Sequence, residues 1–208
     1  DSTSMQPSMQ LKQDLIATRA NALKVPVRGD TTTTTLQNYI NICKVNKMVC
    51  VLSLVEPYGW GENPYAYGMS SHTYTWTTPS MLQLLSDNED YVVINIGNGA
   101  FGDNMSQTVF RDVTHSMIST LRVWGVRNQL MIEGGNWGQD WQHHMLDNAE
   151  FLLSKDPLRN MIFGVHIYDA YPTAAEAERY IQAYHDLNLP IVISEFGPIH
   201  RKRFPDLR

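Results

Sequence analysis

Hydrophobic and polar positions alternate along the chain in blocks that predict a repeated strand–helix unit. Six short runs are apolar at most positions, which is typical of strands buried on both faces. These runs span residues 21–27, 48–55, 90–97, 128–134, 161–168 and 189–197. Segments with helical spacing of apolar residues lie before and between them and predict helices over 8–19, 34–46, 77–87, 106–124, 141–155 and 173–187. This alternation predicts parallel βαβ units with right-handed crossovers.

Two α/β topologies fit this repeat, an open doubly wound sheet and most of a (β/α)8 barrel. No Gly-rich phosphate loop follows any of the six runs, which weakens the nucleotide-binding topology. Polar and aromatic residues gather instead at the predicted C-terminal ends of the strands, where barrel enzymes place their sites. They are Asn98, Glu133, Asn136, Trp137, His166, Tyr168 and Glu195.

The length of 208 residues fits a single domain over 1–208. A complete barrel typically takes about 250 residues. We therefore expect a (β/α)8-type domain that is incomplete, with about six βα units.

Composition and charge exclude several other classes. The formal net charge of −5 gives no electrostatic reason to expect nucleic acid or an anionic membrane as a partner. No run of eighteen apolar residues is present, so no membrane-spanning segment is expected. The first ten residues lack the basic start and the apolar stretch of a signal peptide.

The remaining candidate motifs favour structural roles. Cys43 and Cys50 are expected to be two buried thiols rather than a disulfide. His143 and His144 are adjacent on a predicted helix and would point about 100° apart, so no shared metal ion is expected. The sequence RGD at 28–30 is explained by a turn after the strand at 21–27.

Four segments carry a resemblance to a known family. "DYVVINIGN", "NWGQDW", "DPLRNMIFGVHIYDAY" and "LPIVISEFG" resemble strands four to seven of glycoside hydrolase family 5. The similarity is greatest to its bacterial endo-β-1,4-mannanase branch, with cellulases further off, and weaker similarity extends it over residues 14–197. The resemblance implies a (β/α)8 barrel that hydrolyses β-1,4-mannan or a related glucan with retention. Two glutamates about 5–5.5 Å apart do this work in such enzymes. It also implies secretion and no cofactor.

The resemblance assigns roles to five residues. Glu195 in "VISEFG" matches the nucleophile. His166 and Tyr168 match the pair that contacts the sugar and orients that nucleophile. Asn98 matches the asparagine that binds the sugar 2-hydroxyl, and Trp137 matches a tryptophan that could stack on a sugar ring.

The departures from the family pattern matter as much. Gly99 stands where the family has its acid/base glutamate, and Lys24 stands where it has an arginine that supports the nucleophile. Val55 replaces a histidine. The first and last strands of the family barrel have no counterpart in the chain. Without an acid the leaving sugar is not protonated, which typically costs about 10²–10⁴-fold in rate.

Weaker alternatives for the acid are Glu133, Glu56 and Glu62. The segment 56–76 also contains Tyr65, Tyr67, Tyr74 and Trp76, which could form a sugar-binding lip or pack the loop.

Three functions follow from these residues. The first is an impaired retaining glycoside hydrolase with Glu195 as nucleophile. The second is a non-catalytic carbohydrate-binding protein that uses Asn98, Trp137, His166 and Tyr168. The third is a self-assembling subunit, because the strands at 21–27 and 189–195 would have open edges that invite pairing into a homo-oligomer.

Overall fold

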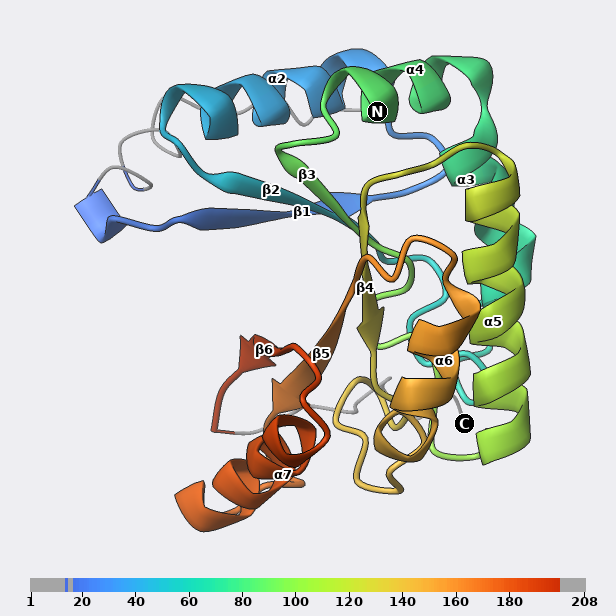
Figure 1. The fold of residues 1–208 in the computed structure, drawn as a ribbon, viewed down its shortest axis with the longest axis vertical. Coiled ribbons are helices and arrows are strands. Elements are labelled where there is room, and N and C mark those ends of the chain that lie inside the picture. Colours follow the sequence, from blue (N-terminus) through green and yellow to red (C-terminus); the bar gives the residue numbers. More distant parts are fainter. Residues whose placement is uncertain (1–13, 15–16, 199–208) are drawn as a thin grey trace.

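A computed structural model describes residue 14 and residues 17–198, which form one curved parallel sheet with helices along its outer side (Figure 1). Each strand pairs in parallel with the next one in sequence, so the spatial order is β1-β2-β3-β4-β5-β6. The strands are β1 (Ala22–Val27), β2 (Val49–Leu54), β3 (Val92–Asn95), β4 (Gln129–Glu133), β5 (Met161–Ile167) and β6 (Ile191–Phe196).

Helices connect successive strands. They are α2 (Thr33–Val45), α3 (Thr73–Thr77), α4 (Pro79–Asp87), α5 (Gln107–Val123), α6 (Ala149–Lys155) and α7 (Ala174–Asp186), with short 3₁₀ helices η1 (Met69–His72) and η2 (Leu146–Asn148). All six predicted strands are confirmed, and so are the helices expected at 34–46, 77–87, 106–124 and 173–187. The helix expected at 8–19 lies mostly outside the described residues.

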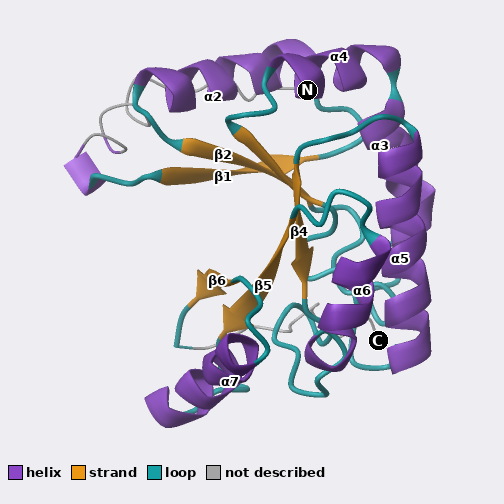
Figure 2. Ribbon diagram, in the orientation of Figure 1, coloured by secondary structure: helices purple, strands orange, loops and turns teal. Residues whose placement is uncertain are grey.

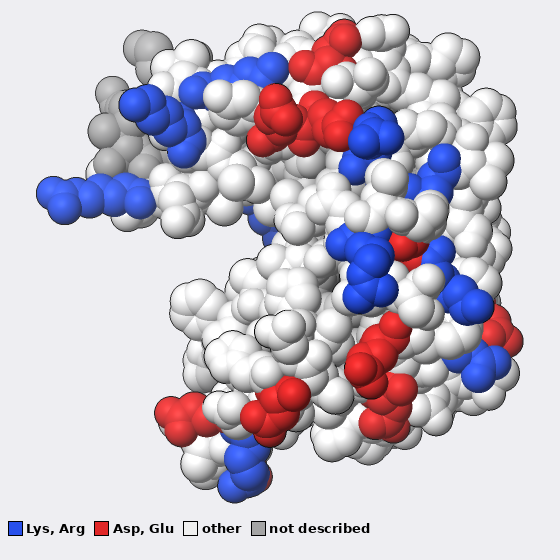
Figure 3. All heavy atoms as spheres, viewed as in Figure 1, with Lys and Arg blue, Asp and Glu red and all other residues white. Residues whose placement is uncertain are grey.

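The sheet forms an open half-barrel rather than a closed cylinder. The ribbon views show β1 and β2 on one side of a wide gap and β5 and β6 on the other (Figures 1 and 2). The surface is deeply hollowed there in the space-filling view (Figure 3). The prediction of an incomplete α/β barrel is therefore confirmed.

Side-chain caps fix where four of the helices begin. The hydroxyl groups of Thr32, Thr78, Ser106 and Thr173 each accept a hydrogen bond from a backbone N–H in the first turn. Thr173 and Glu176 form a reciprocal capping box. The threonine run at 31–35 thus leads into α2, as predicted.

The core lies between the outer helices and the sheet. Leu36 and Ile40 of α2, Phe110 and Ile118 of α5, and Tyr184 of α7 are fully buried against strand residues. Burial of such side chains is the main force that holds the layers together, at about 25 cal/mol per Å² of apolar surface. Cys43 and Cys50 belong to this core as free thiols, as predicted.

The structure corrects one helix. The segment predicted as a helix over 141–155 is helical only in η2 and α6, and its first residues form a turn. His143 has a left-handed φ of 60°, which no α-helix tolerates. The prediction that His143 and His144 share a helix is therefore wrong. They lie in the loop after β4.

Candidate active site

Polar side chains from five strands converge on the concave side of the half-barrel. Lys24 comes from β1, Asn95 from β3, Glu133 from β4, His166 from β5 and Glu195 from β6. His166 and Glu195 are direct partners in the β5–β6 register, next to an irregularity between Val165 and His166. Because parallel strands end at the same edge of the sheet, residues far apart in sequence meet here.

Glu133 is the best-connected carboxylate of this cluster. Its Oε1 accepts hydrogen bonds from Lys24 Nζ at 3.0 Å and Asn95 Nδ2 at 2.8 Å. Its Oε2 accepts one from the backbone N–H of Gly99 at 2.8 Å and lies 2.9 Å from His166 Nε2. Burial opposes ionisation, but the charges of His166 and Lys24 and the Gly99 N–H outweigh it and hold the pKa of Glu133 well below its usual range. A carboxylate held in this way is an acceptor and a poor proton donor.

Glu195 is the more accessible carboxylate, with 28% of its side chain exposed. Its Oε1 accepts from Lys24 Nζ at 3.0 Å, and its Oε2 accepts from the Tyr168 hydroxyl at 3.2 Å. Burial and the charge of Glu195 raise the pKa of Tyr168 to about 12, which keeps the phenol protonated as a donor. These contacts fix the Glu195 carboxylate in one orientation on the concave side of the half-barrel.

His166 lies between the two carboxylates and is fully buried. Its Nδ1 lies 3.5 Å from Glu195 Oε2, while its Nε2 faces Glu133. Burial lowers the pKa of His166, but the two neighbouring carboxylates outweigh this and raise it above the ordinary value. Lys24 and His166 thus bridge the same two acids.

Gly138 allows the loop after β4 to lie directly on His166. A Cβ at this position, where φ is +88°, would come within 2.4 Å of His166 Nδ1. The Gly138 carbonyl accepts a hydrogen bond of 2.8 Å from the His166 backbone N–H. The imidazole is therefore held by the loop as well as by the sheet.

Gly99 adopts a backbone conformation that favours glycine. Its φ is +49°, and a Cβ there would lie 2.8 Å from Tyr58 Cε2 and 3.0 Å from the Trp137 carbonyl oxygen. Residue 99 therefore offers its N–H to Glu133 and no side chain to the site.

The other two candidate acids are engaged elsewhere. Glu56 accepts a hydrogen bond from the Gly29 backbone N–H at 2.9 Å and lies 3.3 Å from His72 Nδ1. Glu62 accepts one from Trp137 Nε1 at 3.1 Å. These contacts tie Glu56 to the turn after β1 and to η1, and Glu62 to the loop after β4.

The two predicted sugar-binding residues outside β5 and β6 are both buried. Asn98 directly precedes Gly99, and its Oδ1 accepts a hydrogen bond of 3.3 Å from the Ser53 hydroxyl. Trp137 is only 2% exposed and meets Tyr58 edge to face at 5.0 Å between ring centroids. A ring buried to this degree presents no open face to a sugar, so the structure does not support the stacking role expected for Trp137.

A different tryptophan of the same loop is open. Trp141 is 47% exposed and lines a cavity of about 380 Å³ together with Gln139, Asp169 and Ala170. These residues belong to the loops after β4 and β5, on the same end of the sheet as Glu133 and Glu195. The second tryptophan of "NWGQDW" is thus the better placed aromatic, which sequence comparison alone could not distinguish from the first.

Asp140 organises this loop and was not singled out by the sequence. Its buried carboxylate accepts hydrogen bonds from the backbone N–H groups of Gly135, Met145 and Leu146 and from the Tyr180 hydroxyl at 2.6 Å. Burial raises the pKa of Asp140 to about 6 against the effect of these donors. The carboxylate stabilises a loop in which five residues have positive φ: Asn136, Trp137, Gly138, Asp140 and His143.

The aromatic residues of segment 56–76 divide between the two roles considered, packing of the loop and formation of a sugar-binding lip. Trp76 is fully buried in the core, whereas Tyr65 and Tyr67 are mostly exposed. Tyr74 is half exposed, and its hydroxyl lies against Gly29. Only Tyr65, Tyr67 and Tyr74 could therefore contribute to a lip.

Within residues 14 and 17–198, no group of three or more His, Cys, Asp or Glu side chains is placed to hold a metal ion. In the same part of the chain, none of the helices combines the length and apolar character that crossing a membrane requires.

Comparison with known proteins places the chain among glycosidases. The family Cellulase (glycosyl hydrolase family 5) matches residues 4–206. A mannan endo-1,4-beta-mannosidase from Streptomyces lividans is 36% identical over 198 residues, and one from Cellvibrio japonicus is 34% identical over 202 residues. These alignments cover 93% and 95% of this chain, but 51% and 46% of the two relatives.

Solved structures agree with these sequence matches. A beta-mannanase from Streptomyces thermolilacinus superposes with a TM-score of 0.85 at 34% identity, over 91% of this chain and 65% of that one. The mannotriose complex of a Thermomonospora fusca beta-mannanase gives 0.85 at 30% identity, over 90% and 64%. The chain therefore spans about half the length of these curated relatives and less than two thirds of these solved chains.

Proposed function

Because this chain belongs to glycosyl hydrolase family 5, we propose that it is a β-1,4-mannanase-type domain that keeps its nucleophile and lacks its proton donor. The observation that carries the proposal is the contrast between Glu195 and Gly99. Glu195 is held by Lys24 and Tyr168 at an accessible strand end, whereas residue 99 has no side chain and a left-handed backbone.

The chemistry follows from retention by double displacement. A Glu195 oxygen attacks the anomeric carbon, the glycosidic C–O bond breaks, and the bonding electrons leave with the aglycone oxygen. That oxygen needs a proton, which Glu133 cannot supply because it is ionised and its oxygens face four donors. The missing acid/base carboxylate would also activate the water that hydrolyses the glycosyl–Glu195 intermediate in the second step. Natural substrates should therefore turn over about 10²–10⁴-fold more slowly than with an acid present.

The proposed substrate is β-1,4-linked mannan. The supporting observations are the mannan endo-1,4-beta-mannosidase names of the relatives and the mannotriose and mannohexaose complexes of the solved structures. A related β-1,4-glucan is the alternative. Secretion is expected from the nature of such a polymeric substrate.

The experiment compares two substrates that differ in leaving group. A 2,4-dinitrophenyl β-mannobioside releases a phenolate that needs no proton, whereas mannohexaose releases a sugar alkoxide that does. We expect release of dinitrophenol by the chain, loss of this release in Glu195→Gln, and barely detectable cleavage of mannohexaose. Rapid cleavage of mannohexaose, or equal phenol release by Glu195→Gln, would overturn the assignment.

A non-catalytic carbohydrate-binding role is the second candidate, and Gly99 is the observation that favours it. Such a protein would bind mannohexaose through the more open side chains of Trp141 and Tyr168 without forming a covalent bond to Glu195. Titration calorimetry with mannohexaose, alongside the phenol-release assay, separates the two. Binding without phenol release favours the second candidate, and absence of binding excludes it.

Self-assembly through the sheet edges stays a prediction. Among the described residues β1 and β6 are the outer strands of the sheet, and Phe196 of β6 is largely exposed. Such edges invite pairing with another chain. Light scattering over a range of concentrations tests this, and a monomer at the highest concentration would contradict it.

A further inference from the structure

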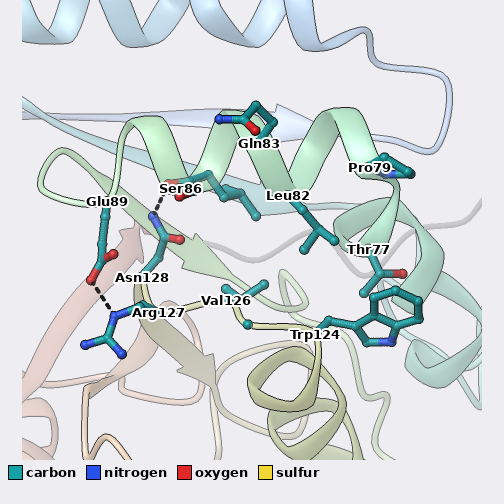
Figure 4. A pocket seen from close by; sticks show the side chains of 12 residues that line it. Thr77, Pro79, Leu82, Gln83, Ser86, Glu89, Trp124, Val126, Arg127 and Asn128 are labelled. Atoms are coloured by element: carbon teal, nitrogen blue, oxygen red, sulfur yellow. Dashed lines mark hydrogen bonds and ion pairs between the residues drawn. The ribbon is translucent and has the colours of Figure 1, made fainter.

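A second cavity of about 440 Å³ lies at the opposite end of the sheet from the candidate active site. It opens between α4 and the turn that joins α5 to β4 (Figure 4). That turn and Glu89 precede β4 and β3, whereas Glu133 and Gly99 lie at or beyond the ends of the same strands. The length of the strands therefore separates the two sites.

The cavity has an aromatic end and a charged end. Trp124, the C-cap residue that follows α5, is 55% exposed and lies beside Thr77. At the other end Arg127 Nε lies 3.5 Å from Glu89 Oε1. Leu82 of α4 and Val126 lie between these ends (Figure 4).

The floor of the cavity is held rigidly by Asn128. Its buried amide donates hydrogen bonds to the carbonyl oxygens of Leu85 at 3.2 Å and Val92 at 3.3 Å. These bonds tie the start of β4 to α4 and β3. The volume is within the range of preformed small-molecule sites, about 300–1,000 Å³.

The charges of the lining residues favour an uncharged ligand. Arg127 and Glu89 are the only charged residues in the lining, and they cancel each other. The polar side chains of Thr77, Gln83 and Ser86 add hydrogen-bonding groups around the apolar centre. An exposed aromatic face with a polar rim matches a sugar ring, which has an apolar C–H face and hydroxyl groups at its edge.

We propose that this cavity, defined by Trp124, Leu82, Val126, Glu89 and Arg127, is a second carbohydrate-binding site for an uncharged oligosaccharide. A sugar ring stacks on Trp124, and hydroxyl groups of a neighbouring unit bond to the Arg127–Glu89 pair. The choice of a β-1,4-mannan chain as ligand rests on the proposed function; the site itself rests on its own geometry. A polymer could occupy both ends of the domain, which would retain the protein on its substrate.

The test is a nuclear magnetic resonance titration of the intact chain with mannohexaose, following the tryptophan indole N–H signals. Trp124→Ala assigns the Trp124 signal. We expect this signal to shift and saturate in the chain as it is, and Arg127→Met to weaken the binding that it reports by about tenfold. Val123→Ala is the matched control, because Val123, the last residue of α5, is 85% exposed and does not line the cavity. A Trp124 signal that stays fixed, or an equal loss in Val123→Ala, would overturn the proposal.

The same titration distinguishes this site from the active site. The Trp141 indole signal reports on the cavity that Trp141 lines with Gln139, Asp169 and Ala170, at the same end of the sheet as Glu195, and Trp141→Ala should leave the Trp124 shift unchanged. A shift of Trp124 alone supports the second site and contradicts mannan binding at the proposed active site. A shift of Trp141 alone supports mannan binding at the active-site end of the sheet and contradicts the second site. Since Arg127 is largely exposed, Arg127→Met keeps the test valid if Trp124→Ala fails to fold.

Discussion

The backbone N–H of Gly99 donates a hydrogen bond of 2.8 Å to Oε2 of Glu133. Residue 99, the proposed acid/base position, thus helps to keep a neighbouring buried glutamate ionised. Because φ of Gly99 is +49° and a Cβ there would lie 2.8 Å from Tyr58 Cε2, this arrangement favours glycine.

Gly99→Ala should lower the free energy of unfolding. A left-handed conformation costs a residue with a Cβ about 1–2 kcal/mol, and the contacts with Tyr58 and the Trp137 carbonyl add to this. Gly125→Ala is the control, because Gly125 has φ +83° and nothing lies within 4 Å of its added Cβ. Urea unfolding should show a greater loss of unfolding free energy for Gly99→Ala than for Gly125→Ala. An equal loss in the two variants would show that the contacts with Tyr58 and Trp137 do not crowd a Cβ at residue 99. Because any side chain at residue 99 meets the same backbone strain and the same contacts, Gly99→Glu alone should restore little mannan hydrolysis.

Lys24→Met should destabilise the fold and weaken reaction at Glu195 together. The change removes a donor from the buried Glu133, a loss that costs about 1–3 kcal/mol, and it frees one oxygen of Glu195. Unfolding in urea and phenol release from the dinitrophenyl substrate measure the two effects. Lys47→Met, a change at an exposed lysine, is the control. Unchanged phenol release in Lys24→Met would show that Lys24 does not position Glu195.

The Glu133–His166 pair should make stability depend on pH in a defined window. The pKa of His166 is raised above 6.5 in the folded protein. The stability that its charged imidazole contributes is therefore full below about pH 6.5 and is lost as pH rises through the pKa of the folded state. The pKa of Glu133 is lowered below 4.5, so its contribution is full above about pH 4.5 and is lost as pH falls through the folded value.

His166→Asn isolates this effect from other titrating groups such as Asp140. The difference in unfolding free energy between the original chain and the variant should be largest between about pH 4.5 and 6.5 and should shrink at higher pH. Urea unfolding at a series of pH values measures it. A difference that stays constant from pH 5 to 9 would mean that His166 is not charged in the fold.

The two tryptophans of the loop after β4 should separate stability from binding. Trp137→Ala removes a ring that is 2% exposed and should cost about 3–5 kcal/mol of stability. Trp141→Ala removes a ring that is 47% exposed and should leave stability nearly unchanged. It should weaken mannohexaose binding about tenfold, equal to about 1.4 kcal/mol. Thermal unfolding measures the stability of the two variants, and titration calorimetry measures their affinity for mannohexaose. Full affinity in Trp141→Ala would contradict a role of Trp141 in sugar binding.

The sequence was sufficient to predict the strands and most of the helices because their signals are local. Buried parallel strands are apolar throughout, and Thr32, Ser106 and Thr173 mark helix starts by their own chemistry. The loop after β4 could not be predicted, since its shape depends on the Asp140 carboxylate reaching backbone groups up to six residues away and Tyr180 forty residues away. Periodicity there indicated a helix that the tertiary contacts exclude.

The candidate site was only partly predictable for a similar reason. The resemblance identified Glu195, His166 and Tyr168, which the structure brings together. It could not show that Trp137 is buried while Trp141 is open, because both belong to the same motif. Nor could it show that Lys24 bridges Glu133 and Glu195, which requires β1 to face β4 and β6 across the half-barrel.

Covalent trapping at Glu195 tests directly whether this carboxylate acts as the nucleophile. A 2,4-dinitrophenyl 2-deoxy-2-fluoro-β-mannobioside needs no acid to react, and its fluorine slows release of the glycosyl group. Intact-protein mass spectrometry should show the addition of one fluoromannobiosyl group, and peptide mapping should locate it on Glu195. No addition is expected in Glu195→Gln. A folded chain that forms no adduct, or one that carries it on another residue, would contradict the claim that Glu195 remains a working nucleophile.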